Sequence, residues 1–194
     1  MKNNPYMYCV AVALALNGLG GCALTNDGMP LAQMTFEHIK PYPVYVASYE
    51  AVPLAHKTNL PQGFVADPGV LISDYFKNRF QASGHQGKLK SVIEHVSVAY
   101  GVENSDHKVG NFLGLGKREH YRVDAAVKLE LLGGQDHDMS EVRLKAYRDI
   151  YISEHVSMVE REKAQMEGLD KLLDDLDIAV RDVISRQFKL LGQK

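Results

Sequence analysis

Two segments in the second half of this 194-residue chain alternate between apolar and polar residues, and this alternation constrains the fold more than any other feature. In residues 120–132 every second side chain is apolar, and residues 141–152 repeat the pattern after a turn at residues 133–138. Successive side chains of a β-strand point to opposite faces, so a period of two buries one face and leaves the other in water. That contrast is typical of an antiparallel sheet covered on one side.

Two earlier strands and a helix are predicted before these segments. Residues 44–52 and 88–100 are rich in β-branched and aromatic side chains, which favours strands. Between them, Asp67 and Pro68 supply an N-cap acceptor followed by a proline at the first helical position. We therefore expect a helix over residues 68–83, which ends before Gly84.

The last predicted element is a long helix over residues 158–191. Ser157 and Glu160 form the pattern of a capping box at its start. At 1.5 Å per residue this helix would reach about 50 Å, which is longer than a four-stranded sheet is wide. We expect it to project, to kink near Gly168 or to pack on something else. Packing on the sheet is favoured over a coiled-coil seam, because the apolar repeat is shorter than four clean heptads.

These elements predict one α+β domain over residues 44–194. Its expected core is a four-stranded, mainly antiparallel sheet with the element order β-α-β-β-β-α and with both helices on one face. A chain of this length with 45% apolar residues can bury a substantial core.

A short apolar segment sets residues 1–21 apart as a cleaved export signal. Lys2 supplies the only charged side chain, and residues 7–16 form an apolar run about half as long as a membrane-spanning helix needs. A charged start, a short apolar middle and small residues at the exit are the parts of a secretory signal peptide. The alternative is a buried N-terminal helix of the domain.

The residues that follow the apolar run, Leu-Gly-Gly-Cys at 19–22, resemble the lipobox of bacterial lipoproteins. The resemblance implies that the Cys22 thiol is acylated, that the chain is cut before Cys22, and that the new amino terminus is acylated too. No aspartate follows directly, which in enterobacterial lipoproteins implies the periplasmic face of the outer membrane. Residues 22–43 would then be a lipidated tether, and several acyl chains give stable membrane anchoring.

Composition and spacing argue against several other functions. With 22 Lys and Arg against 24 Asp and Glu, the net charge of −2 does not suit a nucleic-acid partner. The eight histidines include no pair at the i, i+4 spacing of a helical zinc motif, so we expect no metal site. The glycine-rich residues 110–116 match no phosphate-binding loop, and no G-x-S-x-G motif occurs. We therefore predict a protein that is not an enzyme and has no cofactor besides the lipid on Cys22.

The predicted link between the second and third strands, residues 101–119, is longer than an antiparallel pair needs, since hairpin loops usually take about two to five residues. Its apolar and basic side chains make it a candidate contact with a partner protein or a lipid interface. These candidates are Phe112, Leu113, Leu115, Lys117 and Arg118. The alternative is a loop that folds back and covers one end of the core.

The element order behind a lipobox is similar to that of small envelope-assembly lipoproteins and of the auxiliary lipoproteins of ABC-type transporters. This resemblance implies a membrane-anchored, non-enzymatic accessory subunit of an envelope transport machine, with an envelope protein complex as its partner. The polar face of residues 141–152 adds Tyr147 and Tyr151, aromatic residues of the kind enriched at interfaces. The alternative function is a periplasmic module that binds a glycan or a lipid in a concave pocket.

Overall fold

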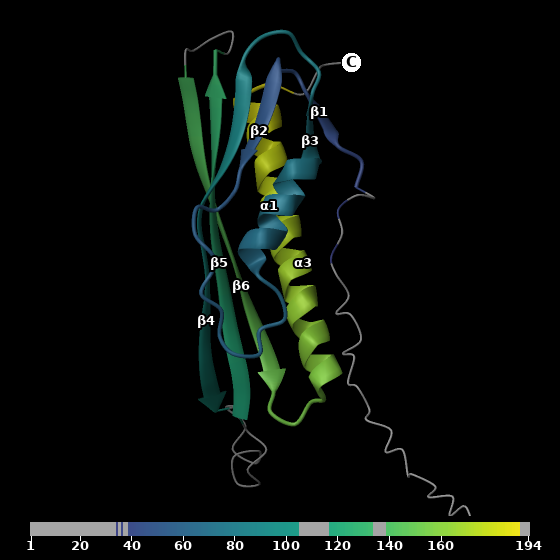
Figure 1. Ribbon diagram of the computed structural model, residues 1–194, viewed down its shortest axis with the longest axis vertical. Helices are drawn as coiled ribbons and strands as arrows, with labels where there is room; N and C mark the ends of the chain where they lie inside the picture. Colours follow the sequence, from purple (N-terminus) through teal and green to yellow (C-terminus); the bar gives the residue numbers. More distant parts are fainter. Residues whose placement is uncertain (1–33, 35, 37–38, 105–116, 134–138, 191–194) are drawn as a thin grey trace, which may run out of the picture. The chain divides into compact units, whose positions relative to one another are not determined.

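A mixed four-stranded sheet with helices on one face forms the centre of the fold (Figure 1). The computed structural model describes residues 34, 36, 39–104, 117–133 and 139–190, which belong to one compact unit, Gln33–Lys194. Its elements are β1 (Tyr42–Val44), β2 (Ser48–Val52), α1 (Pro68–Arg79), β3 (Phe80–Ala82), β4 (Lys88–Asn104), β5 (Lys117–Leu132), β6 (Met139–Ser153), α3 (Met158–Asp182) and the π-helical turn η1 (Val183–Gln187). The predicted α+β fold is confirmed.

The strands of the main sheet follow the order β2-β4-β5-β6. As predicted, β4, β5 and β6 are antiparallel neighbours in chain order. The edge strand β2 instead runs parallel to β4, from Ser48↔Lys88 to Val52↔Val92. A parallel pair needs a long crossover connection, and the segment that contains α1 supplies it.

The residues predicted as one first strand, 44–52, form two separate strands. β1 ends at Val44 and pairs in parallel with β3, whereas β2 belongs to the main sheet. β3 occupies residues predicted to be the last turn of the first helix, so α1 ends at Arg79. The chain is tightly packed here, because a Cβ at Gly84 would lie 2.6 Å from the backbone carbon of Tyr45. Strands of three residues are too short to show a periodicity in the sequence.

The β4–β5 pair is longer than predicted. Its register continues through Gly101↔His120, Val102↔Glu119, Glu103↔Arg118 and Asn104↔Lys117. The prediction of a loop over residues 101–119 is therefore wrong at both ends, and Lys117 and Arg118 belong to β5. The candidate residues Phe112, Leu113 and Leu115 lie outside the described residues.

The long helix α3 lies along the sheet rather than across it (Figure 1). Its 25 residues span about 38 Å and the 16 residues of β5 span about 53 Å, so the strands are long enough to support the helix along its whole length. The favoured arrangement, packing of the helix on the sheet, is confirmed, and projection beyond the sheet is not observed. α3 ends at Asp182 and continues as η1. No helix among the described residues is long and apolar enough to cross a membrane.

Both helices begin as the sequence predicts. The Asp67 side chain accepts a hydrogen bond from the Gly69 backbone N–H at 2.8 Å, which caps α1. At the start of α3, Ser157 and Glu160 form a capping box in which each side chain bonds the other's backbone N–H. The hydrogen bond from the Ser157 backbone lowers the pKa of the Glu160 carboxyl below its ordinary value.

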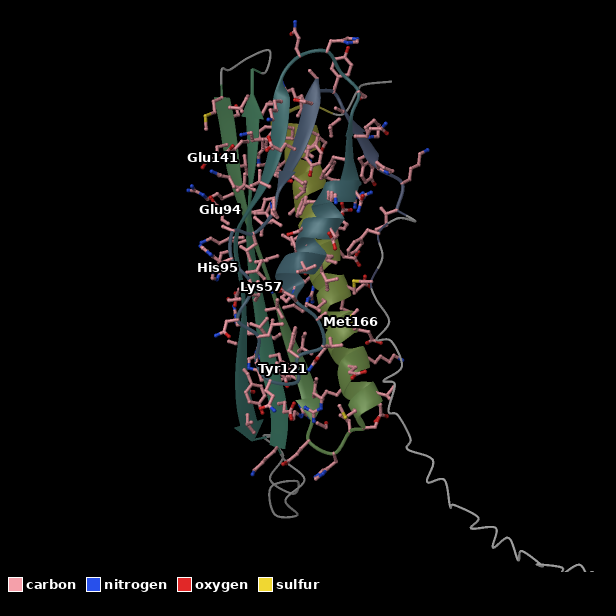
Figure 2. All side chains as sticks on the ribbon, viewed as in Figure 1. Lys57, Glu94, His95, Tyr121, Glu141 and Met166 are labelled. Carbon is pink, nitrogen blue, oxygen red and sulfur yellow. The ribbon has the colours of Figure 1, made fainter. Side chains whose placement is uncertain are left out.

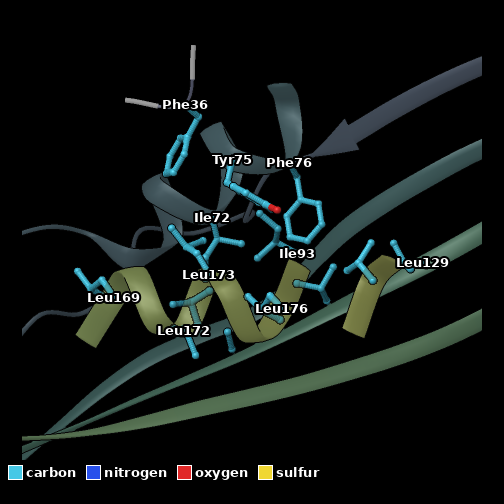
Figure 3. Close-up of a cluster of buried hydrophobic side chains, with 14 of the residues drawn as sticks. Phe36, Ile72, Tyr75, Phe76, Ile93, Leu129, Leu169, Leu172, Leu173 and Leu176 are labelled. Carbon is cyan, nitrogen blue, oxygen red and sulfur yellow. The ribbon is translucent and has the colours of Figure 1, made fainter. Parts of the chain in front are cut away.

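The hydrophobic core fills the space between the sheet and the two helices (Figure 3). Leucines of α3 meet aromatic and aliphatic side chains of α1 and the inner face of β4 and β5. Among the buried residues are Ile72, Tyr75, Phe76, Ile93, Leu129, Leu169, Leu172, Leu173 and Leu176. The inward residues of β5 are those that the alternation of residues 120–132 predicts to be buried.

Candidate docking surface

The sheet face opposite the helices carries both acidic and basic side chains, many of them in ion pairs (Figure 2). Lys128 Nζ lies 2.6 Å from Glu130 Oε1 and 3.8 Å from an oxygen of both Glu94 and Glu141. The hydrogen bond with Glu130 raises the pKa of the Lys128 ammonium above its ordinary value. Ion pairs within β5 and between strands therefore link charged side chains on this open face.

A β-bulge in β4 adds one of these acidic side chains to the open face. The register shifts between Ile93, which faces Val127, and His95, which faces Ala126. The extra residue, Glu94, accepts hydrogen bonds at 3.1 Å from Arg143 Nε on β6. A bulge places two residues opposite one on the partner strand, so Glu94 and His95 both reach the outer face. The contact with Glu94 raises the pKa of Arg143.

Near the end of the sheet, three strands meet at His120 of β5. Its Nε2 lies 2.7 Å from Asp149 Oδ1 on β6, and its Nδ1 lies 3.2 Å from Glu103 Oε1 on β4. The His120 ring also stacks on Tyr151, with 4.6 Å between ring centroids and 8° between ring planes. The His120 side chain is 20% exposed, so the stack and the two carboxylates cover most of it.

The second aromatic residue of β6, Tyr147, is held in a similar way by Arg122. The Arg122 guanidinium carbon lies 4.2 Å from the Tyr147 ring centroid, a cation–π distance. Arg122 also faces Asp124 at 3.4 Å and Asp149 at 3.7 Å. Tyr147 and Tyr151 remain 57% and 51% exposed, although a neighbouring side chain is stacked on each ring.

We call this group of side chains the aromatic–ionic cluster. Its members are Glu103, His120, Arg122, Tyr147, Asp149 and Tyr151. Both nitrogens of His120 and the guanidinium of Arg122 already face carboxylates. What the cluster offers to a ligand is therefore the exposed part of two fixed tyrosine rings with charged groups beside them.

The structure brings some of the sequence-predicted site residues together and separates others. Tyr147 and Tyr151 lie on the polar face of β6, as the alternation predicts. Arg118 pairs with Glu103 in the β4–β5 register and is exposed near Tyr151, whereas Lys117, one residue earlier, points to the other face. The lipidation candidate, Cys22, lies outside the described residues.

Sequence reasoning missed His120, Arg122, Asp149 and Glu103 as members of the site. The alternation of residues 120–132 does place His120 and Arg122 on the polar face. What the sequence lacks is the strand register that sets Asp149 and Glu103 on either side of the imidazole. Register depends on the loops and on the packing of the buried face, so periodicity alone does not fix it.

A shallow hollow runs beside the second half of α3, where Tyr42, Ile178, Arg181 and Arg186 contribute to its wall. Within the described residues no group of three or more His, Cys, Asp or Glu side chains is arranged to hold a metal ion.

Comparison with known proteins gives no relative from which a role could be carried over. No protein-family model matches the sequence, and no curated protein matches it.

Proposed function

We propose that this protein is a lipid-anchored periplasmic subunit that docks onto a larger envelope transport machine and is not itself an enzyme. The sequence supports the anchor, since residues 19–22 resemble a lipobox with Cys22 as the acylated residue. The proposed location is the periplasmic face of the outer membrane. The acyl chains would hold the domain at the membrane and leave its open sheet face free for a partner.

The observation that carries the docking proposal is the pair of exposed, immobilised tyrosines on the open face. Tyrosine and arginine, together with tryptophan, are the side chains most enriched among residues that dominate binding energy at protein interfaces. Here Arg122 and His120 hold Tyr147 and Tyr151 in place before any partner arrives. A side chain that is already ordered loses less conformational entropy on binding, so the cluster is suited to recognise a protein surface.

The segment after β4 belongs to the same proposal at the level of sequence. Phe112, Leu113 and Leu115 would contact the partner or the lipid interface, with Lys117 and Arg118 beside them. Replacement of Phe112 and Leu113 by serine separates this role from that of a core lid. A contact segment loses partner binding and keeps its melting temperature, whereas a lid loses several degrees.

The test is recovery of partners from crosslinked bacterial envelopes with the epitope-tagged chain, read by mass spectrometry. Wild type should recover a defined envelope protein, and Cys22→Ala should lose both membrane association and that recovery. The double variant Tyr147→Ala/Tyr151→Ala should stay membrane-bound but recover the partner at least about tenfold less well. Tyr45→Ala is the matched control, because Tyr45 is 53% exposed and lies outside the main sheet. Equal recovery of the partner by Tyr147→Ala/Tyr151→Ala and by Tyr45→Ala would contradict the docking proposal.

One observation favours glycan binding as a second candidate function. Exposed tyrosine rings next to carboxylates and a guanidinium can stack on the C–H face of a sugar while the charged groups bond its hydroxyls. Binding of purified envelope glycans that is lost in Tyr147→Ala, together with no recovered protein, would favour this function over docking.

A further inference from the structure

His120 has a carboxylate at each of its two ring nitrogens, and the two carboxylates come from different strands. Asp149 of β6 lies 2.7 Å from Nε2, and Glu103 of β4 lies 3.2 Å from Nδ1. A neutral imidazole has one N–H donor and one acceptor nitrogen, whereas an imidazolium has two donors. Ionised carboxylates only accept, so both contacts are favourable only when the ring carries two protons.

We infer that His120, when protonated on both ring nitrogens, links the end of β4 to β5 and β6 through its two carboxylate contacts. We call this pH-dependent link the clasp. In the charged state the ring bridges Glu103 and Asp149 across three strands. When the ring loses a proton, one nitrogen presents a lone pair to a carboxylate and that contact becomes repulsive. Asp149 keeps a second partner in Arg122, at 3.7 Å, so the contact that opens is the one with the more exposed Glu103.

The groups that face the ring from each strand are consistent with this assignment. β4 contributes Glu103, β6 contributes Asp149 and the stacked Tyr151, and β5 itself contributes Arg122. Arg118 also lies on this face of β5, two residues before His120. Arg122 pairs with Asp149 at 3.7 Å, and Arg118 lies opposite Glu103 in the β4–β5 register.

The end of β4 is a place where one side-chain contact can decide local order. β2 pairs with β4 only as far as Val92, so the later residues of β4 have β5 as their only strand partner among the described residues. On the inner face of this end, Tyr100 and Val102 are 50% and 56% exposed and add little buried area. Strand ends with few buried contacts open locally at low free-energy cost.

The clasp therefore makes the β4–β5 end depend on pH. Histidine is the side-chain type that most readily changes its charge across the physiological pH range. The paired end of β4 and β5 should therefore open locally less often at pH 5 than at pH 8.5. Tyr151 stacks on the same ring, so a change in the charge of His120 also affects the proposed docking surface. The clasp itself does not require a partner.

The test is hydrogen–deuterium exchange of the full chain in detergent at pH 5.0 and 8.5, with labelling times scaled to the intrinsic exchange rates. In wild type, protection of residues 101–104 and 117–120 should fall on the order of fivefold at pH 8.5, relative to strand residues 123–129. His120→Gln and Glu103→Gln should each abolish this pH response, and circular dichroism confirms that each variant is folded. His95→Gln is the matched control and should keep the response, because His95 lies on the same face and, among the described residues, its ring bonds Ser97 and no carboxylate.

Equal protection at the two pH values in wild type, or an unchanged pH response in His120→Gln, would overturn the clasp. Loss of partner recovery in the tyrosine variants at both pH values, with no pH response of the strand end, would support docking and overturn the clasp. A pH response without any partner would support the clasp and contradict docking.

Discussion

Arg79 and Asp177 meet in a two-point ion pair that joins α1 to α3. Arg79 Nε lies 2.7 Å from Asp177 Oδ1, and Nη2 lies 3.0 Å from Oδ2. The Tyr75 hydroxyl donates to the same carboxylate, and Arg79 Nη1 donates to the backbone oxygen of Lys40 at 3.1 Å. One buried carboxylate thus connects both helices, and its arginine partner also holds the chain just before β1.

Removal of one partner from this pair should destabilise the fold strongly. Arg79→Ala leaves Asp177 buried without its main partner, and the free energy of unfolding should fall by about 3 kcal/mol. Urea unfolding followed by circular dichroism measures this change. Lys163→Ala removes an exposed pair with Glu167 and should leave the midpoint unchanged. Similar urea midpoints for Arg79→Ala and Lys163→Ala would mean that the Arg79–Asp177 pair does not stabilise the fold.

The same carboxylate predicts how stability changes with acid. Burial would raise the pKa of Asp177, but hydrogen bonds from Arg79 and Tyr75 and the nearby Arg181 outweigh it and lower the pKa below its ordinary value. The contribution of ionised Asp177 is therefore present above the unfolded pKa of about 3.9 and is lost as pH falls through the lowered folded value. Unfolding free energies between pH 6 and pH 2.5 should fall less steeply in Asp177→Asn than in wild type. Asp170→Asn, at an exposed position of α3, should keep the wild-type slope.

The packing of α3 on β6 depends on the absence of a side chain at Gly168. A Cβ there would lie 2.4 Å from Ile150 Cδ1 and 2.5 Å from Cγ1, so either the Ile150 side chain or the helix would have to shift. Gly168→Ala should cost about 2 kcal/mol despite the better helix propensity of alanine. Thermal unfolding should show no such loss for Gly101→Ala, since a Cβ at Gly101 meets nothing within 4 Å. Combining Gly168→Ala with Ile150→Ala should cost less than the sum of the two single changes.

Gln165 is the buried polar side chain that ties α3 to the loop before α1. Its Oε1 accepts a hydrogen bond from the Val65 N–H at 2.8 Å, and the residue has no exposed surface. Gln165→Leu leaves that N–H without its partner, which should cost about 1–3 kcal/mol. Hydrogen exchange of residues 61–66 should then become faster, whereas Gln187→Leu on the exposed side of η1 should have no effect there. Unchanged exchange in Gln165→Leu would contradict this role.

Much of the fold follows from patterns within single segments. The alternation of residues 120–132 and 141–152 predicts two adjacent half-buried strands, and the capping residues Asp67 and Ser157 mark the helix starts. These features depend on near neighbours in the chain, so the sequence carries them directly. Burial alternates along β5 as the pattern predicts.

The features that the prediction missed depend on contacts between distant segments. The parallel pairing of β2 with β4 and the small β1–β3 sheet need the return of the chain after α1. The sequence does not predict the extension of β4 through Asn104, because glycine and asparagine, at positions 101 and 104, are typical of loops. Of the aromatic–ionic cluster, the sequence analysis predicted only the two tyrosines. The acids that flank His120 come from other strands, so their positions depend on the strand register.

The most direct test of the docking proposal is photocrosslinking with a benzophenone amino acid at position 147 of the full-length protein in living cells. The proposal predicts that position 147 forms an adduct with one defined envelope protein. Position 45, equally exposed but outside the main sheet, should form none. Adducts of the same intensity at both positions, or no protein adduct at 147, would show that the open sheet face does not dock a partner.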